Sequence, residues 1–274
     1  MSLPNLPIVK RLSPTITRIL AHNPGKFTLQ GTNTYLVGTK NRRVLIDCGE
    51  GLDEYTASLA DHLKRENLTI EAILLTHWHH DHTAGLGPVL EALNLEVPIY
   101  KVPSPCDDDD FKIIPVTDNQ TLDLCGTKLT VLHTPGHTED HLVVWVHDDK
   151  VMLSADNVLG HGTSSYENYS SYMKSLERML AYPELGVIYP GHGEVIEDGP
   201  AKIKEYISHR KDRENQVLRV IEQHGPVSAH RITELVYPDV PPQVFPAALR
   251  GVEQFLEKLV SDKKISGGTH HSKI

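Results

Sequence analysis

Short apolar runs separated by charged or turn-forming residues fill the first 200 positions of the chain. Their lengths and patterns predict strands at residues 16–20, 34–37, 44–46, 72–75, 97–102, 121–124, 129–133, 142–146, 151–153 and 186–189. Apolar residues at helical spacing predict helices at 52–68, 82–95 and 172–181. Strands that alternate with helices and also form hairpins indicate an α/β fold, in which layers of mixed sheet stack with helices outside.

The pattern changes after Pro200. Residues 201–224 predict one long amphipathic helix, and shorter helices are expected at 228–235 and 247–261. Three helices and a short lysine-rich end indicate a small appended domain of winged-helix type. We therefore predict a catalytic domain at 1–200 and a helical domain at 201–274. We expect the second domain to pack on the first as a cap, in preference to binding DNA.

Composition limits the class of protein. The 274 residues are 39% apolar, and no segment approaches the roughly 20 apolar residues that span a bilayer, so we expect no membrane partner. The three cysteines lack paired spacing, which favours a reducing, intracellular compartment. Seven basic residues precede the first acidic one, Asp47, but residues 27–46 already read as strands. We expect the mitochondrial matrix or the cytoplasm, with no clear cleavable signal.

Charge is unevenly distributed. The chain has a formal net charge of −9, whereas residues 201–274 contain twelve Lys and Arg and nine Asp and Glu, a net of +3. The first 200 residues therefore total about −12, which disfavours a general nucleic-acid-binding protein. We interpret the acidic run Asp107–Asp110 as a solvated loop tip. Seventeen histidines are unusual, and histidine is the commonest metal ligand.

The heptapeptide Thr76-His77-Trp78-His79-His80-Asp81-His82 directly follows the apolar strand 72–75. In an extended loop, residues two apart project to the same side, so His77 and His79 can share one metal. Asp81 and His82 begin the next predicted helix, where the chain turns and can face a second metal. Four potential ligands within six residues, at the end of a buried strand, are a strong signal of a metal site.

Two metals need further ligands, because zinc sites use about four each and catalytic sites keep one position open. Three residues elsewhere qualify: His137, Asp156 and His192. Each lies in a loop just after a predicted strand and is flanked by small residues, Gly or Pro. Together with the heptapeptide they form one set with one economical explanation.

This set resembles the metallo-β-lactamase superfamily over nearly the whole chain, with its signature His-x-His-x-Asp-His at 77–82. The resemblance implies an αββα sandwich that holds two Zn²⁺ ions, or Mn²⁺ or Fe²⁺. It implies one metal held by His77, His79 and His137, a second held by Asp81, His82 and His192, and a bridge by Asp156. Asp47 matches the first motif of the superfamily and is expected to orient a ligand histidine. We take Asp81 and Asp47 as the catalytic carboxylates, and expect His80 and His141 near the site but not as ligands.

Such a site predicts hydrolysis by a metal-bridging hydroxide, because two close cations lower the pKa of a shared water. No serine or cysteine nucleophile is required, so we interpret Cys48 as a packed thiol. True β-lactamases usually lack a histidine at the position of His82. Flavodiiron proteins have Glu at the position of His79. Antibiotic hydrolysis and redox chemistry are therefore disfavoured.

A narrower resemblance involves the stretches 23–35, 76–79, 160–163 and 205–210. They are similar to the β-lactamase-like protein 2 endoribonucleases of animal mitochondria. They are equally similar to the fungal metallo-β-lactamase-type thioesterases that release polyketides from acyl carrier protein. The motifs do not separate these two activities, and the oligomeric state is also open.

We take an endoribonuclease on single-stranded RNA as the first hypothesis. Five basic residues of the long helix could neutralise phosphates if they face the cleft: Lys202, Lys204, Arg210, Lys211 and Arg213. A low aromatic content of 6% counts against RNA, because it offers few stacking surfaces. A thioesterase is second, since the same helix could meet an acidic carrier protein. A glyoxalase II-like thioester hydrolase and a nucleic-acid-binding module with a vestigial metal site are weaker alternatives.

Overall fold

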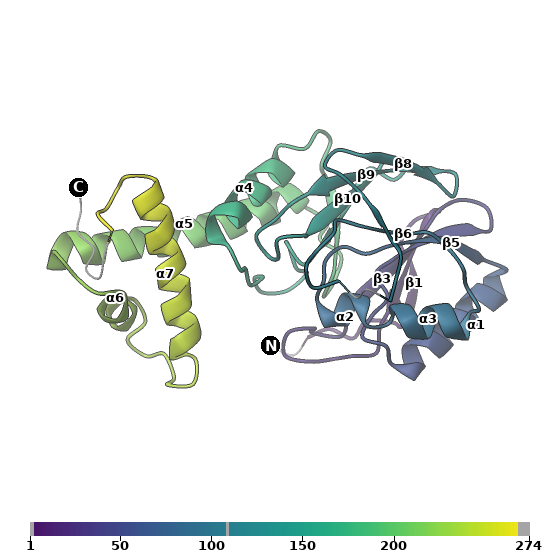
Figure 1. Ribbon diagram of the computed structural model, residues 1–274, viewed down its shortest axis with the longest axis horizontal. Helices are drawn as coiled ribbons and strands as arrows, with labels where there is room; N and C mark the ends of the chain where they lie inside the picture. Colours follow the sequence, from purple (N-terminus) through teal and green to yellow (C-terminus); the bar gives the residue numbers. More distant parts are fainter. Residues whose placement is uncertain (1–2, 108–109, 268–274) are drawn as a thin grey trace.

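The computed structural model describes residues 3–107 and 110–267. Within them, two β-sheets pack face to face (Figure 1). The first sheet runs in chain order through β1 (Val9–Arg11), β2 (Ile16–Leu20), β3 (Asn33–Val37), β4 (Arg42–Ile46), β5 (Thr69–Leu74), β6 (Ile99–Lys101) and β7 (Ile113–Pro115). The second has the order β12 (Val187–Pro190), β11 (Val151–Ala155), β10 (Leu142–Val146), β9 (Thr127–His133) and β8 (Thr121–Leu124).

Helices cover both outer faces of this sandwich. On the first sheet lie α1 (Asp53–Glu66) and α3 (Leu86–Ala92), whose apolar side chains pack on Leu36 and Ile73. On the second sheet, α4 (Tyr169–Leu180) and the start of α5 (Gly199–His224) pack on Val143 and Trp145. Central strands such as β10 are buried on both sides, which explains their continuous apolar sequence. The predicted αββα sandwich is confirmed.

The prediction of one continuous helix at residues 82–95 is wrong. The chain forms a short α2 (His80–Thr83) and then α3, with a break at Gly85. A side chain at Gly85 would overlap the Cys48 carbonyl, and the Gly85 N–H donates to the Gly49 carbonyl at 3.0 Å. The close approach of this distant segment interrupts the helix, and it also fixes α2 at the head of the site.

The edge strands of the first sheet also differ between the prediction and the structure. The short strands β1 and β7 were not expected, because only their pairing with β2 and β6 defines them. The predicted acidic loop tip lies partly outside the described residues, at positions 108 and 109. Asp107 is described, and it is only partly solvated because its carboxylate pairs with the buried Lys101 ammonium at 2.6 Å.

The C-terminal unit contains α5, α6 (Ala229–Val236) and α7 (Phe245–Ser261). Figure 1 shows α5 running from the sandwich out to α6 and α7. One apolar cluster joins β10, α4 and all three helices, so the unit is packed against the larger body as the sequence predicted. The predicted division between residues 200 and 201 falls in the first turn of α5 and stays a prediction. Among the described residues, no helix is long and apolar enough to cross a membrane.

Candidate metal centre

Ligand-type side chains gather at one end of the sandwich, where several strands finish. His77 follows β5, His137 follows β9, Asp156 follows β11 and His192 follows β12. The described chain contains two groups whose ligand atoms lie within 4.8 Å of one another. One group is His77, His79, His137 and Asp156, and the other is Asp81, His82 and His192.

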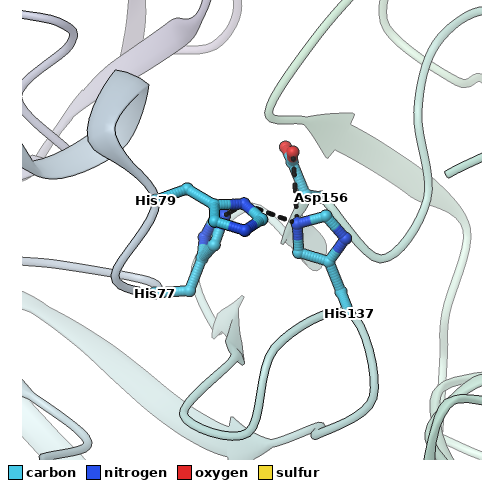
Figure 2. Close-up of side chains that lie close together, drawn as sticks. All are labelled: His77, His79, His137 and Asp156. Atoms are coloured by element: carbon cyan, nitrogen blue, oxygen red, sulfur yellow. Dashed lines mark hydrogen bonds and ion pairs between the residues drawn. The ribbon is translucent and has the colours of Figure 1, made fainter. Parts of the chain in front are cut away.

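In the first group, three imidazoles converge on one point (Figure 2). The His79 Nδ1 atom lies 3.0 Å from His77 Nε2 and 3.0 Å from His137 Nε2. Asp156 completes the group, with Oδ2 at 3.6 Å from His137 Nε2. These nitrogens come from two separate loops, yet their lone pairs face the same small space.

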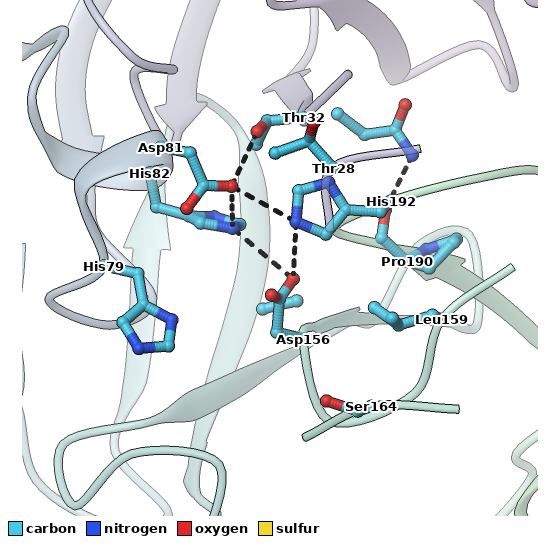
Figure 3. Close-up of polar contacts among 12 residues, drawn as sticks. Thr28, Thr32, His79, Asp81, His82, Asp156, Leu159, Ser164, Pro190 and His192 are labelled. Atoms are coloured by element: carbon cyan, nitrogen blue, oxygen red, sulfur yellow. Dashed lines mark hydrogen bonds and ion pairs between the residues drawn. The ribbon is translucent and has the colours of Figure 1, made fainter. Parts of the chain in front are cut away.

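The second group centres on Asp81 (Figure 3). Its Oδ2 atom lies 3.4 Å from His82 Nε2 and 3.2 Å from His192 Nε2. Asp156 Oδ1 lies 3.4 and 3.3 Å from the same two nitrogens. The two oxygens of Asp156 therefore face different groups, as expected for a bridging residue.

The donor set fits divalent metal ions. Two ligand atoms that each lie about 2 Å from one ion at a tetrahedral angle are about 3.3 Å apart, close to the spacings in both groups. His82 Nε2 and Asp156 Oδ1 are buried and have no hydrogen-bond partner among the described residues. Unpartnered polar atoms are costly in a protein interior, and metal ligation would satisfy both atoms.

Asp47 connects the two groups from behind. It follows β4, is 2% exposed, and its Oδ2 accepts a hydrogen bond from His82 Nδ1 at 2.7 Å. The same carboxylate accepts the Thr76 hydroxyl at 2.8 Å and the Thr76 N–H at 2.8 Å. Because the Thr76 hydroxyl donates its proton to Asp47, its oxygen can accept a hydrogen bond from His77 Nδ1, 3.0 Å away. Asp47 thus orients His82 directly and His77 through Thr76, which leaves both Nε2 atoms free for a metal.

Backbone carbonyls orient two other histidines. His137 Nδ1 donates to the Ser165 carbonyl at 3.0 Å, and His192 Nδ1 lies 3.4 Å from the Gly31 carbonyl. In the neutral imidazole, each contact favours the proton on Nδ1 and leaves the lone pair on Nε2, the nitrogen that faces the site. The tautomers required for metal binding are therefore built into the fold.

Electrostatics differ between the two groups. Burial and the neighbouring His137 lower the pKa of His79 to about 4, so it is neutral at pH 7. Burial opposes the charge of His192, but Asp156 and Asp81 raise its pKa to about 9. Burial likewise opposes the charge of Asp156, but His192 and His82 hold its pKa well below its ordinary value. In the metal-free protein, ionised carboxylates and histidines balance each other at the second group.

His80 and His141 lie near the site but outside both groups. His80 is exposed and lies 3.8 Å from a Glu50 carboxylate oxygen. His141 is buried, and its Nε2 accepts the Asp156 N–H at 3.2 Å, so it supports the bridging residue through the backbone. Cys48 is fully buried, and burial with the adjacent Asp47 raises its thiol pKa, which suits a packed thiol.

Sequence reasoning missed the role of residues 32 and 33. The Thr32 hydroxyl donates to Asp81 Oδ2 at 2.9 Å, and the Asn33 amide donates to the Pro190 and Gly193 carbonyls at 2.9 Å each. Asn33 thereby fixes the loop that holds His192. Both residues lie in the stretch 23–35, which carries part of the family resemblance. The spacing of residues in the sequence could not indicate which distant loop this stretch contacts.

Two hollows adjoin the metal groups. The metal cleft, about 700 Å³, is lined by His79, Asp81, His137, Asp156 and His192. The side cavity, about 520 Å³, lies beside it and is lined mainly by apolar residues that include Leu75, Leu86, Phe111 and Ile113. Trp78 and His80 line both, so the two hollows share a wall.

One large class of metal-dependent hydrolases is built as an αββα sandwich with clustered histidines and aspartates at its strand ends. Residues 27–192 match the metallo-beta-lactamase superfamily, and residues 228–269 match the beta-lactamase associated winged helix domain. The chain belongs to the metallo-β-lactamase superfamily, and residues 228–269 of its C-terminal unit form the winged-helix domain.

Curated relatives align along nearly the full length. A beta-lactamase-like protein 2 homolog of Caenorhabditis elegans is 39% identical, covering 95% of this chain and 89% of the relative. The lactamase-like protein vrtG of Penicillium aethiopicum is 42% identical, covering 96% and 87%. An atrochrysone carboxyl ACP thioesterase of Passalora fulva is 38% identical, covering 96% and 80%. Both groups named by the sequence resemblance are therefore present among the relatives.

Solved structures support the fold. A metallo-beta-lactamase family protein of Thermus thermophilus superposes with a TM-score of 0.73 at 21% identity, covering 96% of this chain and all of its own. A beta-lactamase domain protein of Burkholderia ambifaria gives a TM-score of 0.79 at 16% identity, covering 97% and 93%. At these identities the likeness concerns architecture alone.

Proposed function

We propose that the protein is a two-zinc thioesterase that hydrolyses an acyl thioester. The observation that carries this proposal is the side cavity next to the metal cleft. Its apolar wall suits a hydrocarbon or aromatic acyl group, and a cavity of about 520 Å³ has room for a sizeable one. Because Trp78 and His80 line both hollows, an acyl group in the cavity would place its thioester over the metal cleft.

The basic helix gives less support to RNA than the sequence suggested. Of the five basic residues, only Arg210 lines the metal cleft. Lys202 pairs with Glu205, and Lys211 pairs with Glu177. Arg213 lies over the Tyr237 ring at 5.0 Å. A cleft that binds a polyanion would be expected to present more unpaired cations.

The activity of one relative adds support for a thioesterase. The Passalora fulva protein, 38% identical over 96% of this chain, is named as an acyl carrier protein thioesterase. A carrier protein is acidic in general character, so the net charge of +3 on residues 201–274 is compatible with such a partner.

The residues of the two metal groups would have distinct roles in thioester hydrolysis. When bound, two zinc ions would supply a nucleophilic hydroxide near pH 7 and polarise the thioester carbonyl. His77, His79 and His137 would hold one ion, and Asp81, His82 and His192 the other. Asp156 faces both sets and would fix their spacing. Thr32 keeps Asp81 in place, while Asp47 restrains His82 and His77.

Endoribonuclease activity on single-stranded RNA is the second candidate, and one feature favours it. Phe27 is 80% exposed and lines the metal cleft, and the Lys26 ammonium lies 5.6 Å from its ring centre. Arg210 lines the same cleft. An exposed aromatic ring beside cations can stack a base and neutralise a phosphate.

The deciding experiment compares two substrates on the same zinc-loaded, full-length protein. One assay follows cleavage of a fluorescent single-stranded RNA, and the other follows release of free thiol from an acyl-carrier thioester. We expect turnover of the thioester, abolished by Asp156→Ala. RNA cleavage without thioester turnover would reject the proposal and favour the second candidate.

A further inference from the structure

Residues 161–168, between β11 and α4, hold a metal ligand in place. His137 Nδ1 donates to the Ser165 carbonyl at 3.0 Å and lies 3.2 Å from the Ser164 hydroxyl. The Glu167 and Asn168 N–H groups donate to the Gly136 carbonyl at 2.8 and 3.0 Å. We call residues 161–168 the support segment, because His137 depends on it for its tautomer and orientation.

Arg210, from the middle of α5, secures this segment from the C-terminal side. Its Nη2 donates to the Ser164 carbonyl, next to the peptide unit that receives His137. The guanidinium carbon lies 4.8 Å from the centre of the Tyr166 ring, also within the support segment. The planar cation therefore holds the segment by both a hydrogen bond and ring stacking.

Helix α7 secures the end of the same segment. The buried Gln254 side chain accepts the Tyr169 N–H at 2.8 Å, at the first residue of α4. Glu214 of α5 accepts the Tyr169 hydroxyl at 3.1 Å and pairs with Lys258 of α7 at 3.1 Å. Helices α5 and α7 of the C-terminal unit thus contact the middle of the support segment and the residue that directly follows it.

We infer that Arg210 is a positioning residue for the metal centre, and that α5 of the C-terminal unit sets zinc affinity through it. Arg210 acts on His137 through the Ser164–Ser165 backbone and needs no contact with substrate. This inference holds for a thioester or an RNA substrate alike, because it concerns the binding of zinc itself.

The test measures zinc binding to the full-length protein by competition with a chromophoric chelator. Partners that orient a metal-binding histidine are typically worth 10–100-fold in metal affinity, and Arg210 acts one step further out. We expect Arg210→Ala to weaken the binding of one zinc ion by about tenfold. Arg210→Lys, which keeps a donor for Ser164, should recover part of that loss. Arg213→Ala removes the same charge one turn along α5 without touching the support segment, and should bind zinc normally.

Two further measurements make the result decisive. The visible absorption of the cobalt-loaded protein should change in Arg210→Ala and not in Arg213→Ala, since it reports ligand geometry. If Arg210→Ala does not fold, Arg210→Lys and Gln254→Ala provide the same comparison. Unchanged zinc affinity with a raised KM would make Arg210 a substrate contact and overturn the inference. Because zinc affinity is measured without substrate, this outcome is separate from failure of the proposed thioesterase.

Discussion

Asp47 Oδ2 accepts the His82 Nδ1 proton at 2.7 Å, while the two residues stand 35 positions apart in the chain. This contact and its relay through Thr76 give one buried carboxylate control over a histidine from each metal group. The metal centre is therefore one hydrogen-bonded unit and not two independent sites.

Replacing Asp47 with Asn should weaken metal binding without removing any ligand. The amide lacks the negative charge that favours an Nδ1 proton on His82, so the free lone pair on Nε2 is no longer specified. We expect zinc affinity to fall about 10–100-fold, as for comparable partners of metal-binding histidines. Competition with a chelator measures this. Asp61→Asn, on the exposed face of α1, is the control, and equal affinities in the two variants would contradict the prediction.

Zinc binding should release protons at neutral pH. His192 has a pKa of about 9 in the metal-free protein, so its imidazole is charged at pH 7 and must become neutral to ligate. Apparent affinity should therefore rise as pH increases from 6 towards 9. Calorimetry in buffers of different ionisation enthalpy counts the protons. His80→Ala, which removes an exposed histidine outside both groups, should release as many as the unaltered protein. An affinity that is flat over this range would disagree with the assigned pKa.

Filling the side cavity should discriminate between acyl groups. A Cβ at Gly87 would meet Phe111 at an ordinary 3.5 Å, so Gly87→Leu projects into the cavity without touching a metal ligand. Each buried CH₂ group contributes about 0.8 kcal/mol, so excluding two or more should raise KM for long acyl thioesters at least about tenfold. Acetyl thioesters should be unaffected. Gly251→Leu, which faces open space on α7, is the matched control.

Gly85→Ala should destabilise the protein, because the new methyl group would overlap the Cys48 carbonyl. Overpacking of this kind costs about 1–3 kcal/mol, and here the obstacle is backbone that cannot rotate away. Urea unfolding of the metal-free protein gives the difference in free energy. Gly87→Ala, two residues along in helical backbone, should be neutral or slightly stabilising. Similar urea midpoints for Gly85→Ala and Gly87→Ala would contradict the prediction and would show that α2 and α3 can shift apart.

Local patterns account for what the sequence predicted well. β10 and β11 are recognisable because each is an apolar run that fits a strand buried on both sides. His77, His79, Asp81 and His82 could be proposed as ligands because they follow such a strand directly. Their grouping with His137, Asp156 and His192 came from the family resemblance, and the structure brings the same residues into two groups.

Features that depend on distant partners could not be predicted. The break at Gly85 is imposed by Cys48, 37 positions earlier, and no helical periodicity contains that information. The amphipathic pattern predicted the long helix α5, but not which of its basic residues line the metal cleft. Likewise, β7 is a strand only because β6 lies beside it.

Helix α5 belongs to both structural units at once. Tyr206 in its first half accepts the Leu159 N–H at 3.0 Å beside the metal cleft, while Ile221 near its end packs with the winged-helix residues. An exchange of the chain after residue 200 would replace nearly the whole of α5, including the Tyr206 hydroxyl that accepts the Leu159 N–H. The two units therefore depend on one shared helix, and the curated relatives align over 95% or more of the chain, across both units.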